Sequence, residues 1–292
     1  MNPLHLRTLL AIIDEGSFEL AAYKLGISPS AVSQRIKALE KAAGRIILRR
    51  TTPVSATQAG EVLVQSARRM ALLEAETNAE LRGHISKIPL SVVVNADSLS
   101  TWFRSVLAQL ASWGQVNLHL RIEDEAHSLS LLRKGDVLGA VTRESQPVAG
   151  CEVMPLGVMR YYSVANPWLL DRYTHDGVVD WMHMPTLRFG SRDSLQDEDF
   201  RKRVGKTLQP EQISQIPSAE AFMEAARVGL GWALLPEQQA LELIESGQVV
   251  RLDDQVMTVP LYWQRWRLES PSLERLSDAV MTAAQQLHHL ND

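Results

Sequence analysis

Four polar side chains recur at helical spacing between Ser28 and Lys41. They occupy positions i, i+3, i+4 and i+7, so a helix places them on one face: Ser30, Ser33, Gln34 and Lys37. The group donates and accepts hydrogen bonds and includes a single charge, whereas a merely solvated helix usually carries Glu/Lys pairs. A helix in the major groove of DNA uses small or bidentate polar groups to contact base edges. We therefore interpret residues 28–41 as a DNA recognition helix.

Three arginines flank this polar face. Arg35 lies at its side, and Arg49 and Arg50 follow the helix in a short basic segment between two strand-like stretches, 46–48 and 54–56. Such a hairpin forms a wing that contacts phosphate or a minor groove. We expect all three arginines to reach the DNA backbone.

A second set of polar residues follows two predicted strands, 90–94 and 118–122. The first strand is followed by Asp97, Ser98, Ser100, Thr101 and Trp102, and the second by Glu123, Asp124 and Glu125. Ligands of open α/β folds bind beyond the carboxyl ends of strands. Adjacent carboxylates repel one another unless a cation or solvent relieves them, and strand alternation would send Glu123 and Glu125 to the same side. Hydroxyls and free N–H groups at a helix start suit an anion such as a carboxylate.

The elements before and after the recognition helix form a recognisable unit. A helix over 3–14 and a helix capped by Ser17 precede it, and Gly26 is expected to be left-handed at the turn. Helix, tight turn and helix make a helix-turn-helix. Thr57 caps a long helix to about residue 83, whose apolar residues recur at nearly heptad spacing: Leu63, Ala67, Met70, Leu73 and Leu81. This narrow seam predicts a partner helix from a second copy, with a plain interdomain rod as the alternative.

Beyond Pro89, strands and helices alternate. Strands over 90–94, 118–122 and 137–141, with helices over 98–110 and 129–132, have the rhythm of a parallel sheet. A second block has strands over 161–165, 186–189, 213–216, 232–235 and 261–263, a helix over 218–228 and a final helix from Ser272. We predict two α/β lobes with a ligand cleft, and hinges at Pro89, 161–165 and 263–267.

Composition narrows the class of protein. The chain has 292 residues and a net charge of −4, yet residues 1–60 carry eight Lys and Arg against four Asp and Glu. A basic module on an acidic body fits phosphate contact at one end. The single cysteine, Cys151, excludes an internal disulfide. Without a signal segment, a membrane span, a zinc spacing or a catalytic signature, we expect a cytoplasmic protein that is not an enzyme, has no metal site or cofactor, and does not contact a membrane.

Motifs along the chain resemble those of LysR-type transcriptional regulators: Gly16-Ser17-Phe18, Ala21-Ala22, Ser30–Ser33, Thr57–Gly60 and, late in the chain, Gly229–Pro236. Within that family, Ser30–Lys37, Val94–Trp102, Glu123–Glu125, Gly139–Val141 and Tyr162-Ser163 resemble the LysG/ArgP branch, which senses basic amino acids and activates their export genes. The segment 191–206 matches no pattern.

The resemblance implies an α/β multidomain fold. Its parts are a winged helix-turn-helix (1–58), a linker and dimerisation helix (59–87), and two Rossmann-like lobes resembling a periplasmic binding protein. Lobe I comprises 88–164 plus 265–292, and lobe II comprises 165–264. It further implies a homodimer or homotetramer that binds double-stranded promoter DNA, senses lysine, arginine or histidine, and activates an exporter gene through RNA polymerase.

In those terms, one or more carboxylates of Asp97, Glu123 and Glu125 bind the ammonium or guanidinium group of the effector. The hydroxyls of Ser98, Ser100, Thr101 and Ser218 receive its carboxylate, Ala219 sets the space, and Trp102 is a candidate cation–π wall. Glu123–Glu125 as a solvated loop, Ser98 and Ser218 as ordinary N-caps, and Trp102 as core stay open. Other functions that stay open are a LysR-type regulator with another effector, such as an aromatic acid, and an amino-acid-binding protein or enzyme with an appended DNA module.

Overall fold

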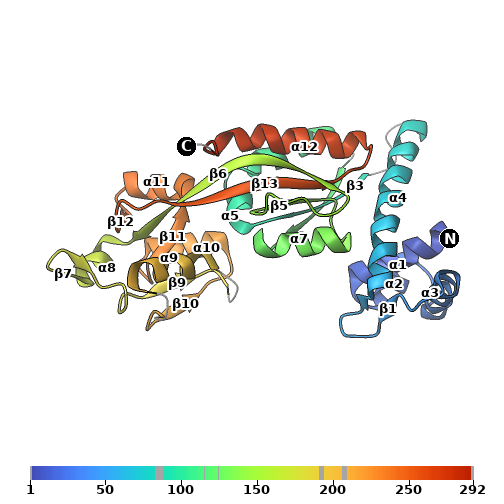
Figure 1. Ribbon diagram of the computed structural model, residues 1–292, viewed down its shortest axis with the longest axis horizontal. Helices are drawn as coiled ribbons and strands as arrows, with labels where there is room; N and C mark the ends of the chain where they lie inside the picture. Colours follow the sequence, from blue (N-terminus) through green and yellow to red (C-terminus); the bar gives the residue numbers. More distant parts are fainter. Residues whose placement is uncertain are drawn as a thin grey trace.

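A helical head forms the N-terminal end of the molecule (Figure 1). It contains α1 (Pro3–Glu15), α2 (Phe18–Leu25), α3 (Pro29–Ala43) and a hairpin of β1 (Leu48–Arg49) and β2 (Ser55–Ala56). The structure is a computed structural model that describes residues 2–82, 88–114, 116–123, 125–190, 194–205 and 209–290, without the side chains of 79, 82, 88 and 125–127. Three helices and a hairpin are the predicted winged helix-turn-helix.

Short-range signals in the sequence set the limits of α3. The hydroxyl of Ser28 accepts a hydrogen bond from the backbone N–H of Ala31 at 3.2 Å, which caps the helix as predicted. Gly26 ends α2 in the left-handed conformation, with φ of 63°. The apolar stripe of α3 is buried in the head core: Val32, Ile36 and Leu39. The opposite, polar face of α3 is therefore left outside.

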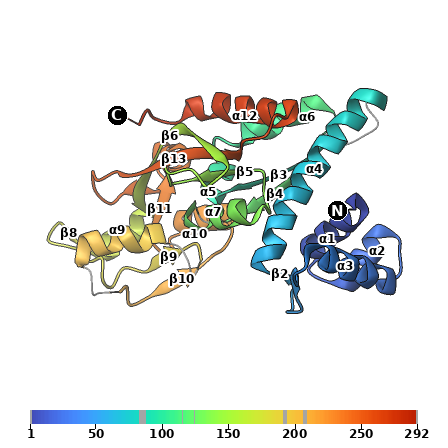
Figure 2. The same ribbon diagram turned by 45° about the vertical axis from the view of Figure 1, so that its right-hand side comes forward.

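The long helix α4 (Gln58–Arg82) leads from the head to the rest of the chain (Figures 1 and 2). Leu63 and Ala67 are buried in the head core, so the start of the predicted seam is not available to a partner helix. Leu72 is buried in a different core, that of the lobes. The remaining apolar residues of the seam are exposed: Met70, Leu73 and Leu81.

An ion pair fastens the head to α4 and to the first lobe. The guanidinium of Arg68, on α4, donates to Asp14 of α1 at 2.6 Å and lies 3.8 Å from the carboxylate of Asp136, which follows α7. One largely buried arginine thus contacts carboxylates of two separate parts of the fold.

The first lobe is built on three parallel strands, β3 (Ile88–Val94), β4 (Val116–Ile122) and β5 (Gly139–Thr142), in the order β5-β3-β4. Around them lie α5 (Ala96–Ser100), α6 (Arg104–Trp113), α7 (Glu125–Lys134) and α12 (Pro271–Ala283), followed by the short η1 (Ala284–Gln286). The single helix expected over 98–110 is two helices. The hydroxyls of Ser100 and Thr101 both donate to the carbonyl of Asp97, competing with the helix backbone where α5 ends.

The second lobe contains β9 (Thr186–Arg188) and β10 (Ile213–Gln215), which are parallel, and β11 (Ala233–Pro236). Its helices are α8 (Pro167–Arg172), α9 (Ser194–Val204), α10 (Ala219–Arg227) and α11 (Glu237–Glu245). Short strands complete it: β7 (Thr174–His175), β8 (Val178–Val179) and β12 (Val250–Arg251). The alternation of strands and helices predicted from sequence is therefore present in both lobes.

Two long antiparallel strands, β6 (Cys151–Ala165) and β13 (Met257–Trp266), join the lobes (Figure 1). The end of β6 pairs with β11 and β12 of the second lobe, whereas Tyr262–Arg265 of β13 pair with β5 of the first. The crossing in β13 therefore lies at Met257–Leu261. Residues 263–265, which belong to the segment expected to act as a hinge, pair with β5 and β6 inside the first lobe. Tyr262 pairs with β5 as well, so the sheet of the first lobe includes residues that the sequence assigned to the second lobe. The last helix begins at Pro271, one residue before the expected start at Ser272, and is capped by Ser270.

Candidate functional site

The outer surface of α3 carries the polar face predicted from the sequence. Ser30, Gln34 and Lys37 are exposed, and Ser33 is half-buried. The hydroxyl of Ser30 lies 2.9 Å from that of Ser28, the helix cap. This face has the small and bidentate groups that contact base edges in a major groove.

The flanking arginines lie at two edges of the head. Arg35 is half-buried and donates to the hydroxyl of Thr8 on α1 at 3.4 Å. Arg49 and Arg50 are exposed on the hairpin, and the guanidinium of Arg50 lies 5.8 Å from the ring centroid of Phe18. Among the described residues, Lys37, Arg49 and Arg50 form no ion pair, so their charges face solvent uncompensated.

A cavity of about 230 Å³ lies between the lobes, where β3 and β4 end opposite β9, α9 and α10. Its described lining residues come from both sides: Ala96, Asp97, Ile122, Glu123, Phe189, Gly190, Leu195, Gln196, Phe222 and Leu234. Strand ends and helix starts on the two lobes thus form one enclosed space, as the position of ligands in open α/β folds predicts.

Two carboxylates supply the charge in this lining. Asp97 and Glu123 are its charged members among the described residues, and both come from the first lobe. The hydroxyl of Tyr161 donates to Oδ2 of Asp97 at 3.0 Å. From the second lobe, buried Gln196 accepts a hydrogen bond from the N–H of Leu234 at 2.8 Å. The cavity is an acidic space with one amide and mostly apolar walls, which suits a ligand with a cationic group and an aliphatic chain.

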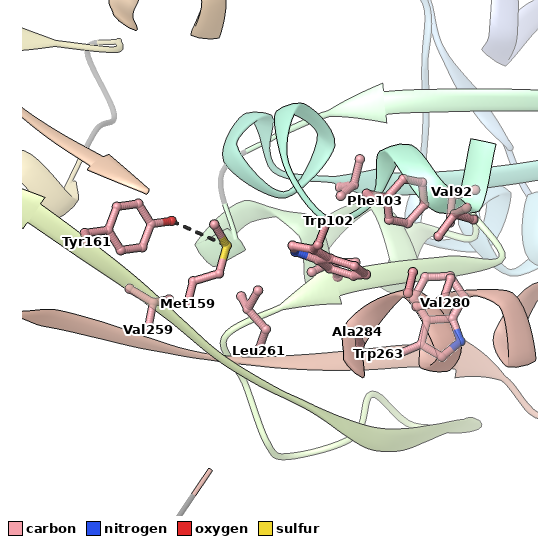
Figure 3. Packing of buried hydrophobic residues seen from close by; sticks show 14 of the residues in the cluster. Val92, Trp102, Phe103, Met159, Tyr161, Val259, Leu261, Trp263, Val280 and Ala284 are labelled. Carbon is pink, nitrogen blue, oxygen red and sulfur yellow. Dashed lines mark hydrogen bonds between the residues drawn. The ribbon is translucent and has the colours of Figure 1, made fainter. Parts of the chain in front are cut away.

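Several residues predicted for this site lie elsewhere. Ser98 is fully buried and its hydroxyl donates to the sulfur of Met159 at 3.5 Å. Trp102 is 1% exposed and packs in the core against Phe103 (Figure 3), with ring centroids 5.5 Å apart. Ser98 is not the N-cap of α5, because Asn95 holds that position. Of the two roles considered for Trp102, a cation–π wall and a core residue, the structure shows the core residue.

The hydroxyls of Ser100 and Thr101 do not line the cavity either, because both point back to the carbonyl of Asp97. Ser100 also accepts a hydrogen bond from the amide of Gln239, on α11, at 3.0 Å. That bond crosses from the second lobe to the first, as does the ion pair between Arg143 and Glu198, whose atoms are 3.9 Å apart.

The remaining predicted residues sit at helix starts. Ser218 is an exposed N-cap of α10, accepting from the N–H of Ala221, and Ala219 is the first residue of that helix. Glu125 begins α7, so the strand alternation expected to align it with Glu123 stops at Ile122. The side chain of Glu125 and all of Asp124 lie outside the described residues.

The second-lobe walls of the cavity were missed from the sequence. Leu195 and Gln196 belong to the segment 191–206, for which no pattern was found. Phe189 and Phe222 fell in a predicted strand and a predicted helix and were given no role in the site. The two phenylalanines form an edge-to-face pair with centroids 6.2 Å apart. The available signal was the position of Phe189 directly after a buried strand, where ligand contacts concentrate.

A buried ion network holds α9 to β6 behind the cavity. Arg203 donates from Nε to Asp199 at 2.8 Å and from Nη2 to the hydroxyl of Ser163, and it also pairs with Asp253. The side chains of Arg203 and Asp199 are 4% and 5% exposed. The guanidinium lies 4.2 Å from the ring centroid of Trp181. α9, which supplies two lining residues, is thus fixed by charges that have little contact with solvent.

A second titratable cluster lies outside the cavity lining. The hydroxyl of Tyr162 and Nε2 of His288 both bond the carboxylate of Glu237, at the start of α11. Burial opposes ionisation of Glu237, but the hydrogen bonds from Tyr162 and His288 lower its pKa below the usual value. Burial and the bond to Glu237 raise the pKa of Tyr162. These contacts tie the C-terminal residues to α11.

Within the described residues, no group of three His, Cys, Asp or Glu is arranged to hold a metal ion. No described helix is long and apolar enough to cross a bilayer.

Comparison with known proteins gives two family matches, which together span most of the chain. Residues 4–61 match the bacterial regulatory helix-turn-helix protein of the lysR family, and residues 88–285 match the LysR substrate binding domain. The "Lysine export transcriptional regulatory protein LysG" of Corynebacterium efficiens is 62% identical over 285 residues, covering 98% of each chain.

Two solved structures are similar over the full length. Full-length LysG from Corynebacterium glutamicum with bound effector Arg has a TM-score of 0.80 at 58% identity, covering 99% of this chain and all of that one. The crystal structure of ArgP from Mycobacterium tuberculosis has a TM-score of 0.84 at 42% identity, covering 98% of each chain. With a recognition helix on a basic head, a cavity between two α/β lobes and both family domains in order, this chain belongs to the LysR family of bacterial helix-turn-helix regulators.

Proposed function

We propose that the protein senses a basic amino acid, lysine or arginine, in the cavity between its lobes and in response controls a gene for basic-amino-acid export. The observation that carries this proposal is the pair of carboxylates, Asp97 and Glu123, in a cavity whose described lining holds no cationic side chain. A site whose described charged side chains are all carboxylates favours a cationic ligand. The similarity to a regulator of lysine export and to one with bound Arg supports the same ligand class.

The size of the cavity limits the ligand. Drug-sized ligands occupy pockets of about 300–1,000 Å³, whereas this cavity measures about 230 Å³. A cavity of this smaller size suits a single amino acid. A neutral amino acid of similar shape brings no cationic group to the carboxylates of Asp97 and Glu123, so it is selected against.

The two ends of the ligand require different partners. Asp97 and Glu123 receive its ammonium or guanidinium groups, and Glu125 stays a candidate for the same role. The hydroxyls of Ser98, Ser100 and Thr101 do not line the cavity, so the α-carboxylate needs another partner. The first turn of α9 is in the right place, since its residues Leu195 and Gln196 line the cavity. The first N–H groups of a helix lack intrahelical partners and favour an anion.

Effector binding changes the relation of the two lobes. Each lobe supplies part of the lining, and the pair Arg143–Glu198 and the bond Gln239–Ser100 cross between them. A ligand shifts such an equilibrium only when it binds the two arrangements differently. Contacts made from both sides at once favour the closed arrangement.

The response reaches DNA through paired heads. The exposed apolar residues of α4 form the surface for a second copy: Met70, Leu73 and Leu81. A dimer, or a pair of dimers, then presents two recognition helices to two half-sites. We propose that the closed lobes set the spacing of the heads so that RNA polymerase is recruited to the promoter.

The effector assignment is tested by calorimetric titration with lysine, arginine and norleucine, which lacks the ε-ammonium group of lysine. We expect the two basic amino acids to bind and norleucine to bind far more weakly. Hydrogen bonds to charged groups contribute about 1.5–3 kcal/mol, so Asp97→Asn and Glu123→Gln should each weaken lysine binding about 10- to 100-fold. Glu220→Gln, at an exposed carboxylate outside the cavity, is the matched control. Wild-type affinity in both cavity variants would refute the assignment.

The DNA assignment is tested by footprinting on candidate promoter fragments with and without lysine. Gln34→Ala should relax the base preference at one position of the half-site, at a cost of about 1–3 kcal/mol. Unchanged affinity and preference would remove Gln34 from the base contacts.

A further inference from the structure

Tyr161 lies on a crossing strand and contacts both lobes. It is 1% exposed and lies on β6, where its register partners are Met257 of β13 and Pro236 of β11. β11 is part of the second lobe, whereas the carboxylate that Tyr161 contacts, Asp97, stands on α5 of the first. One buried hydroxyl thus connects the crossing strands to the acidic lining of the cavity.

The Tyr161 hydroxyl has one proton, and two acceptors of the described residues lie within its reach. Oδ2 of Asp97 is 3.0 Å away. The sulfur of Met159 is 3.7 Å away, and Figure 3 draws this second contact as a dashed line. A hydrogen bond to a carboxylate is roughly twice as strong as a neutral one, and a thioether is a weak acceptor. The proton therefore goes to Asp97, and Met159 supplies a second, weaker acceptor if the carboxylate moves.

We infer that Tyr161 is a positioning residue of the effector site, which holds the carboxylate of Asp97 in the orientation that receives the cationic group of the ligand. The inference rests on the proposed function and names a group that acts through Asp97 without itself lining the cavity. A carboxylate has two oxygens and about four lone-pair sites, so the bond from Tyr161 leaves acceptor capacity for the ligand.

The same contact links ligand binding to the crossing strands. A carboxylate already held in place loses less conformational freedom when the ligand binds, which raises the affinity. Because Tyr161 is packed between β11 and β13, any movement of Asp97 toward the ligand changes a hydrogen bond to the strand that both lobes share. Affinity and closure then depend on one hydroxyl group.

The test is Tyr161→Phe, which removes the hydroxyl and keeps the ring. We expect the dissociation constants of lysine and arginine to rise about tenfold by calorimetry. A role through Asp97 predicts that the change has no further effect in the Asp97→Ala background, where the acceptor is gone, while in the Glu123→Gln background it still costs about tenfold.

Tyr162→Phe is the matched control, since it is the next residue of β6 and its hydroxyl bonds Glu237 outside the cavity lining. Its lysine affinity should equal that of the wild type. Wild-type affinity in Tyr161→Phe would overturn the inference. An equal loss in the Asp97→Ala background would also overturn it, because it would mark a merely structural effect. If the wild-type protein binds neither lysine nor arginine, the proposed function fails and the inference with it.

Discussion

Replacing Arg203 with methionine removes a buried charge and keeps most of the aliphatic side chain. In the native protein the guanidinium bonds Asp199 and Ser163, pairs with Asp253 and lies over Trp181. The substitution leaves the carboxylate of Asp199, which is 5% exposed, without its counter-ion. Removing one partner of a buried pair costs about 3–5 kcal/mol.

Arg201→Met is the matched control on the same helix. The side chain of Arg201 is 48% exposed and its nearest carboxylate, on Asp197, is 3.6 Å away. Exposed pairs at this spacing contribute about 0.3–0.5 kcal/mol. The two arginines are two residues apart, so burial is the main difference between the two substitutions.

The assay is thermal unfolding by calorimetry at low and high salt. A loss of about 3–5 kcal/mol lowers the transition temperature of a domain of 150–250 residues by about 6–20 °C. Salt should remove the small effect at Arg201 and leave the large effect at Arg203, because buried pairs are screened much less. A loss below about 1 kcal/mol for Arg203→Met would refute the reasoning, since Asp199 would then be compensated by other groups.

Four further outcomes are expected. Gly60→Ala places a methyl carbon 2.0 Å from the carbonyl oxygen of Ile47, so it should destabilise the head by about 1–3 kcal/mol. DNA binding should then be weaker, while lysine binding measured by calorimetry should be unchanged. Loss of both DNA binding and lysine binding would contradict an effect confined to the head. Burial raises the pKa of Cys151 to about 12, so its thiol should resist a disulfide reagent at pH 8 until the protein unfolds. The hydrogen bond and charge of Asp180 raise the pKa of His183 above 6.5. An NMR titration should show the raised pKa, and Asp180→Asn should lower it again. The contribution of this pair to folding stability is full below pH 6.5 and is lost as the pH rises through the raised pKa. Arg49→Ala should reduce the slope of log affinity against log salt by about one unit, equally on all DNA sequences.

The head could be predicted almost residue by residue, because its signals are local. A cap at Ser28, a left-handed Gly26 and the buried positions Val32, Ile36 and Leu39 each depend on neighbours a few residues away. Periodicity also indicated the order of strands and helices in both lobes. What it could not indicate was the length of β6 and β13, because their pairing joins residues about a hundred positions apart.

The lining of the cavity between the lobes could be predicted only in part for a related reason. Asp97 and Glu123 were found because each follows a strand in an obvious parallel unit. Ser98 and Trp102 were misplaced because the sequence does not show which side of a short helix faces a cavity and which packs on Met159 or Phe103. The walls contributed by Phe189 and Gln196 depend on how the second lobe docks on the first, which no local pattern specifies.

Helix α4 belongs to two hydrophobic cores, through Ala67 in the head and Leu72 in the lobes, and Arg68 between them bonds carboxylates of both. It therefore acts as a stiff rod that pivots where it contacts the lobes. At a rise of 1.5 Å per residue, the part of the helix from Leu72 back to Gln58 spans about 21 Å, so a tilt of about 10° at Leu72 would move the start of the helix by about 4 Å. That displacement is close to one base-pair step of about 3.4 Å. A small rotation between the lobes and α4 would thus move the head by about one base pair along bound DNA.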